Sequence, residues 1–284
     1  MFEHIAILAP GLLGASVAQA VRRLDVARTI SVWARRPETR LKLKQLQWCD
    51  QMHDTPADAA RAAQLVVICS PVDAIAPLAT LIAPALAPGA LVTDVGSVKG
   101  EVSRLGHAAM RAGTHFVGSH PMAGSEKTGW EHARADLFTH RTVFVTPLME
   151  SDPAAVQRIV GFWAALEAEV VTLNPDRHDE IVAHISHLPK VLASTLCSYL
   201  QHRDHTWRNY AGGGLRDTTR IAAGDPHLWR TILEQNRDEI LHALHAYQDE
   251  LHHFQMALAN RDWLEIQAIF ERGKAYRDQF RPLP

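Results

Sequence analysis

The sequence predicts an α/β protein, in which an N-terminal Rossmann-type doubly wound sheet precedes an all-helical C-terminal dimerisation domain. Strand-like and helix-like segments alternate over the first 173 residues, as they do in a parallel sheet with crossover helices. A glycine-containing loop follows the first strand-like run, and strand signals vanish after about Asn174. We therefore expect a dinucleotide-binding domain over residues 1–173 and a helical substrate and dimerisation domain over residues 174–284.

The elements of the first domain are predicted from hydrophobic pattern and helix-capping residues. Strands are expected over 3–9, 29–34, 64–71, 90–97, 115–121 and 142–147, and helices over 14–24, 37–46, from Val72, over 100–112 and from Pro153, with a last strand before residue 174. The run QLVVICSP is apolar almost throughout, as expected of a strand buried on both faces. Asp152 is placed to cap the helix that Pro153 begins.

The second domain carries one regular apolar series, which steps by 4, 3, 4, 3 and 4 residues. Its members are Ile240, Leu244, Tyr247, Leu251, Phe254 and Leu258. This spacing predicts a coiled-coil-like seam along one helix face. Burial of the seam against a second copy of the chain predicts a homodimer, and an intramolecular helix bundle is the alternative.

Composition describes an ordinary globular protein, with 47% hydrophobic residues, 21% charged residues and a net charge of -2. This charge gives no reason to expect a nucleic acid or an anionic membrane as partner. The N-terminus lacks the pattern of a secretory signal, and three prolines interrupt the longest apolar stretch. The three cysteines have neither disulfide-type nor metal-type spacing, so we expect a cytoplasmic protein without a metal site.

Residues 9–14 read A-x-G-x-x-G and resemble a dinucleotide-binding loop between a strand and a helix. Gly11 would let a pyrophosphate approach the backbone, and Gly14 would let the helix pack closely on the strand. Ala9 replaces the first glycine of the pattern, which is least costly if its φ angle stays negative. The expected cofactor-binding residues here and after the next central strand are Gly11, Leu12, Leu13, Gly14, Ser70 and Pro71.

The end of the second strand indicates which dinucleotide the loop binds. NAD-selective loops place a carboxylate about 20 residues after the last glycine, where it binds the ribose 2′-hydroxyl. This count from Gly14 reaches Ala34, and Arg35 and Arg36 follow. Guanidinium groups bind a 2′-phosphate, so the sequence predicts NADP in preference to NAD.

Three later segments are rich in reactive side chains and carry a family resemblance. They contain TDVGSVKGEV (93–102), GSHPMAG (118–124) with Glu126, Lys127 and Gly129, and ISHLP (185–189) followed by RDTTR (216–220). In these blocks, which occur in order along nearly the whole chain, the sequence resembles the prephenate/arogenate dehydrogenases of tyrosine biosynthesis. The resemblance implies an oxidative decarboxylation of a cyclohexadiene, in which a hydride passes to the nicotinamide and carbon dioxide leaves.

The resemblance also implies a role for individual residues. His120 matches the base that accepts the substrate hydroxyl proton, and Ser97 matches a serine that hydrogen-bonds near it. The substrate-binding residues implied are Arg220, for the carboxylates, His187, Glu126 at the mouth of the site, and Gly213. The blocks do not separate arogenate from prephenate, although a short NADP-type chain is somewhat more similar to arogenate-using members.

Each of these residues also has a structural interpretation. His120 could belong to an ordinary strand-ending loop, His187 could be a core histidine, and Arg220 could be a helix-surface cation. A β-hydroxyacid or imino-acid reductase, or a non-catalytic NADP-sensing protein of the same fold, are the alternative functions. The reductase leaves the GSHPMAG block unexplained, and the sensor leaves the presence of His120, Ser97 and Arg220 unexplained.

Overall fold

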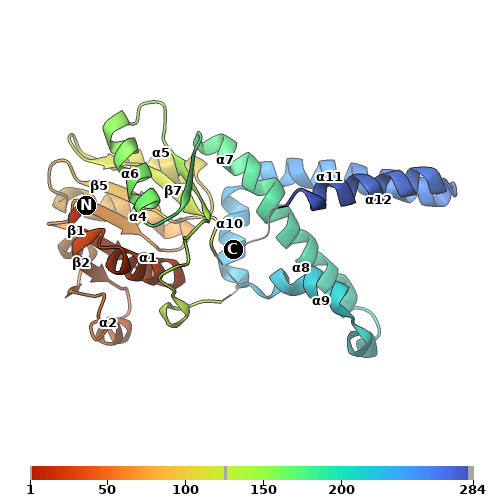
Figure 1. The fold of residues 1–284 in the computed structure, drawn as a ribbon, viewed down its shortest axis with the longest axis horizontal. Helices are drawn as coiled ribbons and strands as arrows, with labels where there is room; N and C mark the ends of the chain where they lie inside the picture. The colour runs from red at the N-terminus through yellow and green to blue at the C-terminus, as the bar shows by residue number, and fades with distance from the viewer. Residues whose placement is uncertain (1, 125–126, 281–284) are drawn as a thin grey trace.

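The computed structural model describes residues 2–124 and 127–280, and it contains a sheet-based N-terminal part and a helical C-terminal part. Figure 1 shows the two parts side by side, with the last two helices projecting from the rest as an antiparallel pair. No helix among the described residues combines the length and the apolar character needed to cross a membrane.

The main sheet has six parallel strands in the order β3-β2-β1-β4-β5-β6. The strands are β1 (Phe2–Leu8), β2 (Ala27–Trp33), β3 (Gln51–His53), β4 (Leu65–Ile68), β5 (Leu91–Asp94) and β6 (His115–Phe116). The strand order reverses between β1 and β4, which makes the gap beyond their carboxyl ends the place where such sheets bind ligands. The predicted doubly wound fold is confirmed, and β3 is an additional short strand that the hydrophobic pattern did not indicate.

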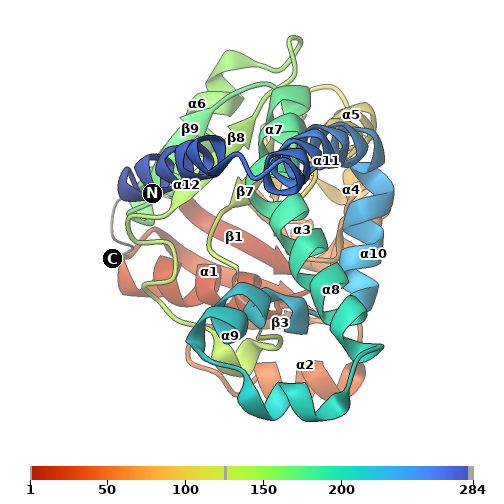
Figure 2. The ribbon, with the colours of Figure 1, turned by 90° about the vertical axis from the view of Figure 1, so that its right-hand side faces the viewer.

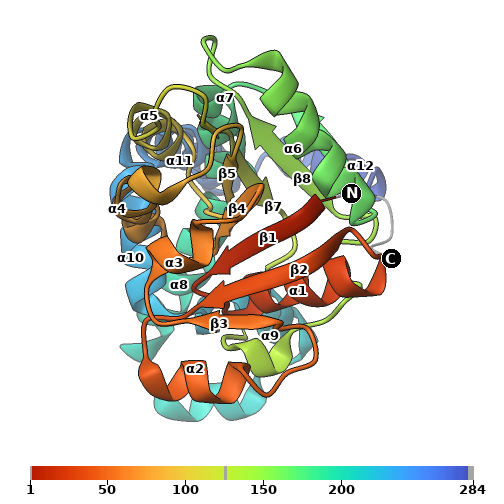
Figure 3. The same cartoon turned by 90° about the vertical axis from the view of Figure 1, so that its left-hand side faces the viewer.

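Helices cover both faces of this sheet, as Figure 3 shows. Alternate strand residues therefore enter two different cores: Ile5 and Ile7 lie with α1 and α6, whereas Ala6 and Leu8 lie with α3 and α4. The helices of this part are α1 (Leu12–Arg23), α2 (Pro37–Leu43), α3 (Pro56–Ala60), α4 (Val72–Ile82), α5 (Gly100–Ala108) and α6 (Pro153–Ala165). As predicted, the Asp152 carboxylate caps α6 by accepting the N–H of Ala155 at 2.8 Å.

The expected strand over 115–121 is divided between two sheets. β6 ends at Phe116, and β7 (Gly118–Pro121) pairs antiparallel with β8 (Thr142–Thr146), which pairs parallel with β9 (Glu169–Thr172). The N–H of Ser119 bonds to the side chain of Asp94 at 3.1 Å instead of to a strand backbone. A β-carbon on Gly118 would lie 2.6 Å from Ser103 Oγ and 2.7 Å from Thr146 Oγ1, so only glycine permits this crossing.

The remaining chain is helical, as predicted. Its helices are α7 (Pro175–Val182), α8 (Leu188–Gln201), α9 (Gly213–Thr219), α10 (Pro226–Gln235), α11 (Arg237–Ala259) and α12 (Trp263–Asp278). A π-helical segment, Ala183–His187, joins α7 to α8. Pro189 lies two residues after its end and has no N–H to continue the ordinary helical bonding. Figure 2 shows α8, α9 and α10 beside the carboxyl ends of the sheet strands.

The predicted seam lies on α11 and is mostly exposed within one chain. Ile240 is buried, whereas Leu251 and Leu258 are 53% and 50% exposed. Trp263, Leu264 and Phe270 add further exposed apolar surface on α12. Within the described residues the helical part covers Ile240 at the start of the seam and part of Phe254, whose ring lies 5.9 Å from that of Phe270.

Candidate active site

The glycine-containing loop lies where β1 passes into α1, at the carboxyl edge of the sheet. A β-carbon on Gly14 would lie 2.9 Å from both Cβ and Sγ of Cys69, so this glycine permits close packing of α1 on the end of β4. A β-carbon on Gly11 would meet no protein atom within 4 Å, and its φ is -87°. Neither packing nor backbone conformation thus requires a glycine here, and the open space at this position would allow a ligand to approach the backbone.

The amino end of α1 is suited to phosphate. No side chain caps it and its first turn holds no acidic residue, so its N–H groups face outward with the positive end of the helix dipole. Leu12 and Leu13 form the first turn of α1. Ser70 and Pro71 follow the adjacent strand β4, across the point of strand-order reversal.

Ala9 does not keep the negative φ angle that would make the substitution of glycine cheap. Its φ is +59°, in the left-handed region that disfavours a residue with a β-carbon. The N–H of Gly11 bonds to Ala9 O at 2.9 Å, and the N–H of Ala9 bonds to Trp33 O at 2.8 Å. The tight turn therefore keeps the glycine-type geometry, and the strain is about 1–2 kcal/mol.

The end of β2 presents exposed positive charge. Arg35 and Arg36 are exposed, and Arg36 lies at the cap position of α2. Arg40 holds this turn by donating to Ala34 O at 2.9 Å, and it also pairs with Asp54 at 3.2 Å. Because Arg40 holds the turn, the guanidinium groups of Arg35 and Arg36 are not needed for that purpose. They lie at the end of β2, where the 2′-substituent of a dinucleotide would lie.

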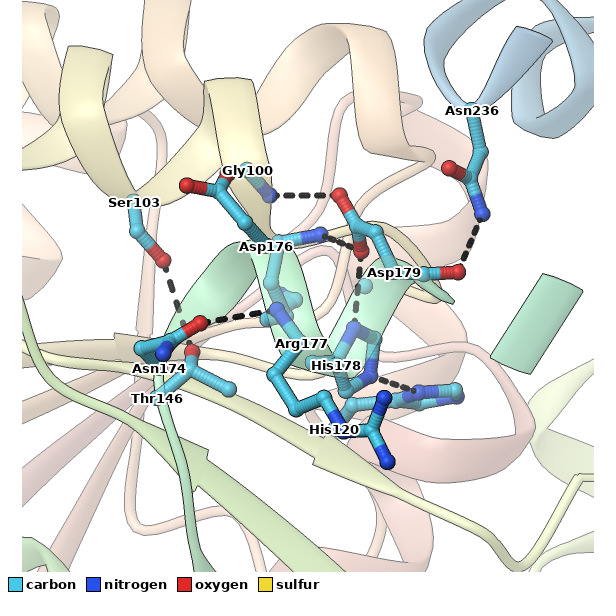
Figure 4. Close-up of polar contacts among 12 residues, drawn as sticks. Gly100, Ser103, His120, Thr146, Asn174, Asp176, Arg177, His178, Asp179 and Asn236 are labelled. Atoms are coloured by element: carbon cyan, nitrogen blue, oxygen red, sulfur yellow. Dashed lines mark hydrogen bonds and ion pairs between the residues drawn. The ribbon is translucent and has the colours of Figure 1, made fainter. Parts of the chain in front are cut away.

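His120 lies on β7 and is the outer member of a buried chain of polar groups (Figure 4). Its Nδ1 lies 2.9 Å from His178 Nε2, and His178 Nδ1 lies 2.8 Å from Asp179 Oδ1. His178 and Asp179 come from α7, so the sheet and the helical part meet in this chain. No hydrogen bond from the described residues reaches Nε2 of His120, which leaves that atom for a ligand.

Asp179 is fixed by backbone groups at the start of α5. Its Oδ1 accepts the N–H of Lys99 at 2.8 Å, and its Oδ2 accepts the N–H of Gly100 at 2.7 Å. Burial raises the pKa of Asp179, and the two backbone bonds and the Lys99 charge oppose that rise. Because both oxygens accept N–H groups, the arrangement suits the ionised carboxylate.

Their surroundings hold the two histidines of this hydrogen-bonded series, His120 and His178, in the neutral form. Burial, together with the nearby His178, Lys99 and His187, lowers the pKa of His120 well below its usual value. Burial lowers the pKa of His178 to about 2. At neutral pH His120 is therefore an unprotonated imidazole, which is the form that accepts a proton.

An ion pair lies directly beneath these groups. Lys99 and Asp94 are both fully buried and pair with each other, and Asp94 also accepts the N–H groups of Gly96 and Ser119. Removal of either partner would leave an uncompensated buried charge, which costs about 3–5 kcal/mol. The pair fixes the β5–α5 loop, on which Ser97 lies half-buried.

His187 lies at the end of the π-helical segment and is 1% exposed. Its Nδ1 lies 3.1 Å from Asn236 Nδ2, and its ring packs edge-on against Trp229 with centroids 6.0 Å apart. Burial lowers the pKa of His187 to about 4. Its Nε2 is buried without a hydrogen-bond partner among the described residues. A buried polar atom without a hydrogen-bond partner destabilises the folded protein unless a ligand or a water molecule supplies the bond.

Arg220 follows α9 on an exposed turn, Arg220–Ala223, that a lysine anchors. Lys190 Nζ donates to Ile221 O at 2.8 Å and to Ala222 O at 3.0 Å. Lys190 follows His187 by three residues, so the two side chains lie on neighbouring positions of one helical run. The buried His187 and the exposed Arg220 are thereby tied to one framework.

For the other residues expected at the site, the structure gives fewer contacts. The hydroxyl of Ser97 makes no hydrogen bond within the described residues, so its role near His120 stays a prediction. Gly213 lies exposed at the start of α9. Glu126 lies outside the described residues.

Three residues of the site were missed in the sequence: His178, Asp179 and Asn236. His178 and Asp179 lie within NPDRHDE, just after the point where strand signals end in the sequence. An adjacent histidine and aspartate in the first turns after the last strand were the available signal. Asn236 sits at the break between α10 and α11, and a helix break is an ordinary place for asparagine.

Comparisons with known proteins agree on one family. The family model described as prephenate dehydrogenase, nucleotide-binding domain, matches residues 17–172, and its dimerization-domain counterpart matches residues 174–272. A cyclohexadienyl dehydrogenase of Zymomonas mobilis is 33% identical over 267 residues, which are 92% of this chain and 90% of that protein.

Solved structures lead to the same family. The prephenate dehydrogenase of Aquifex aeolicus, in complex with hydroxyphenyl propionate and NAD+, superposes with a TM-score of 0.92 at 28% identity and covers 98% of each chain. Synechocystis arogenate dehydrogenase superposes with a TM-score of 0.85 at 27% identity, over 98% of this chain and all of that one.

Proposed function

The chain belongs to the prephenate dehydrogenase family, and from that premise we propose that it catalyses the NADP-preferring oxidative decarboxylation of arogenate, prephenate or both. The observation that carries the proposal is His120, a buried neutral histidine whose outer nitrogen has no hydrogen-bond partner among the described residues. The products would be tyrosine from arogenate and 4-hydroxyphenylpyruvate from prephenate.

The reaction needs a proton acceptor at the ring hydroxyl. Nε2 of His120 accepts the hydroxyl proton while the carbon–oxygen bond becomes a carbonyl. The bond from the ring to its carboxylate then breaks, and its electron pair enters the ring as carbon dioxide leaves. The former carbonyl oxygen becomes the phenol oxygen and takes the proton back from His120, so the protein ends in its starting state.

The bound nicotinamide supplies the acceptor for the hydride that leaves the hydroxyl-bearing carbon. Its pyrophosphate would lie at Gly11 and the first turn of α1, because the space beside Gly11 and the uncapped N–H groups fit an anion. Arg35 and Arg36 would bind the 2′-phosphate of NADP. Ser70 and Pro71, beyond β4, would line the cofactor on the other side of the reversal point.

The helical part would bind the substrate. Arg220 would hold a substrate carboxylate through charge-assisted hydrogen bonds, and His187 would contact the substrate with its buried, unpartnered Nε2. Ser97, Gly213 and Glu126 would complete the site. Residues 1–173 would thus bind the cofactor and contribute His120, Ser97 and Glu126 to the site, and residues 174–284 would bind the substrate with Arg220, His187 and Gly213 and form the dimer.

We propose a homodimer through α11 and α12. The exposed half of the apolar seam, with Trp263, Leu264 and Phe270, is the surface that a second copy would cover.

Initial rates with purified protein test the proposal in four combinations, arogenate or prephenate with NADP or NAD. We expect reduction of the cofactor with at least one substrate, and a faster rate with NADP than with NAD. The double variant Arg35→Ala, Arg36→Ala should lose about tenfold to a hundredfold in kcat/KM for NADP and keep its rate with NAD. The absence of turnover in all four combinations would overturn the enzyme proposal, and a faster rate with NAD would overturn the role of the arginines.

A further inference from the structure

We propose that Asp179, His178 and Asn236 are positioning residues that hold the two site histidines in opposite tautomers, so that Nε2 of His120 carries a lone pair and Nε2 of His187 carries a proton. The inference rests on the proposed function only for its catalytic consequence. The tautomers themselves follow from hydrogen bonds within the described chain.

The first tautomer is set by the Asp179 carboxylate. As an ionised group it can only accept, so the hydrogen of the 2.8 Å bond belongs to His178 Nδ1. A neutral imidazole has one N–H, so His178 Nε2 carries a lone pair. The 2.9 Å bond between the histidines then takes its hydrogen from His120 Nδ1. His120 is neutral too, and its Nε2 is left with a lone pair.

The second tautomer is set by Asn236. Its amide nitrogen lies 2.9 Å from the backbone carbonyl oxygen of Asp179, which can only accept, and this fixes which end of the amide is the nitrogen. The same nitrogen lies 3.1 Å from His187 Nδ1 and has a second hydrogen to donate. His187 Nδ1 is therefore the acceptor, and the single proton of the neutral ring lies on Nε2.

One residue thus controls both rings, through different atoms. The side chain of Asp179 acts on His120 by way of His178, and its backbone carbonyl accepts from Asn236, as Figure 4 shows. The same amide nitrogen of Asn236 faces His187 Nδ1. The chemistry requires this asymmetry, because a base needs a lone pair and a ring that binds an anion or a carbonyl oxygen needs a proton. Two identical tautomers would fail at one of these tasks.

Proton positions test the inference without any reaction. A neutron crystal structure of the deuterium-exchanged protein at neutral pH should show deuterium on Nδ1 of His120, on Nδ1 of His178 and on Nε2 of His187. Deuterium on Nε2 of His120, or on Nδ1 of His187, would overturn the inference. This result stands whether or not the protein turns over arogenate or prephenate, so its failure is distinct from failure of the proposed function.

Paired variants test the consequence for catalysis. In His178→Gln the amide oxygen can still accept from Nδ1 of His120, whereas His178→Leu offers no acceptor. We expect kcat to fall about tenfold to a hundredfold in His178→Leu with little change in KM, and to recover to within about threefold of wild type in His178→Gln. Equal losses in the two variants at equal melting temperature would contradict the positioning role of His178.

Asn236→Asp tests the proposed tautomer of His187. A carboxylate at this position cannot donate to His187 Nδ1, so the proton of His187 should move from Nε2 to Nδ1. We expect KM for the substrate to rise about tenfold with a smaller change in kcat, because His187 faces the substrate and not the transferred proton. His107→Gln, on the half-buried side of α5, is the matched control and should leave both constants unchanged. An unchanged KM in Asn236→Asp would contradict the proposed positioning of His187 by Asn236.

Discussion

The two sides of the candidate site are built in different ways. The His120 side is buried, its hydrogen bonds run through His178 to Asp179, and a fully buried ion pair lies beneath it. The Arg220 side is an exposed turn after a short helix, anchored by two bonds from Lys190. Under the proposed roles, the difference teaches that hydrogen bonds of the fold orient the proton acceptor before substrate arrives, whereas the charged contact to substrate comes from an exposed turn.

Loss of the proton acceptor should have the largest effect. His120→Asn keeps a polar side chain on β7 but removes the group that accepts the hydroxyl proton. We expect kcat to fall about 100-fold to 10 000-fold with little change in KM, measured by steady-state kinetics. His107→Asn is the control, and a His120→Asn variant with full activity would remove His120 from the mechanism.

Loss of the bidentate cation should have a smaller effect of a different kind. Arg220→Lys keeps the charge but loses the planar pair of donors. We expect KM for the substrate to rise about tenfold to a hundredfold while kcat changes less. Arg230→Lys, an exposed arginine on α10, should change neither constant. A fall in kcat without a rise in KM would show that Arg220 does not act by binding the substrate.

The dependence of activity on pH reports on His120, on the buried side of the site. Because burial lowers the pKa of His120 below 6.5, the base stays unprotonated as pH falls through the range in which a free histidine becomes charged. Activity should therefore persist at pH 6.5 and be lost only as pH falls through the lower pKa of the folded protein. Profiles of kcat/KM against pH would check this, and an acid limb centred above pH 6.5 would contradict it.

The smallest effect is expected outside both sides, at the turn of the nucleotide loop. Ala9→Gly removes a β-carbon from a residue with φ of +59°. We expect the free energy of unfolding to rise by about 0.5–1 kcal/mol, after the greater entropy of glycine in the unfolded chain is counted. Urea denaturation measures it, and a loss of stability would show that the turn is not strained.

The fold was largely predictable because burial leaves a regular trace in the sequence. The apolar run around β4 and the alternation through α6 and β9 gave the sheet and its helices. The break between β6 and β7 was not predictable, because it depends on the contacts of Gly118 with Ser103 and Thr146, residues distant in sequence. The φ of Ala9 was not predictable either: the condition for a low-cost substitution, a negative φ, is not met, and Ala9 lies in a turn with bonds to Trp33 and Gly11.

Motifs in the sequence led to the residues proposed for the site, whose roles stay predictions, but they did not indicate where side chains from separate helices meet. His120, His187 and Arg220 lie in recognisable blocks. His178 and Asn236 act only through partners that lie 58 and 49 residues away along the chain, His120 and His187. No local pattern marks such pairs, so their function emerged from the hydrogen bonds.

The transfer of hydrogen from the ring carbon tests the account most directly. A substrate deuterated at the hydroxyl-bearing carbon is incubated with the protein and oxidised cofactor, and the label and the released carbon dioxide are measured. The account predicts that the deuterium appears in the reduced nicotinamide and that carbon dioxide is released in step with it. Deuterium retained in the product or lost to water, or reduction of the cofactor without release of carbon dioxide, would contradict it.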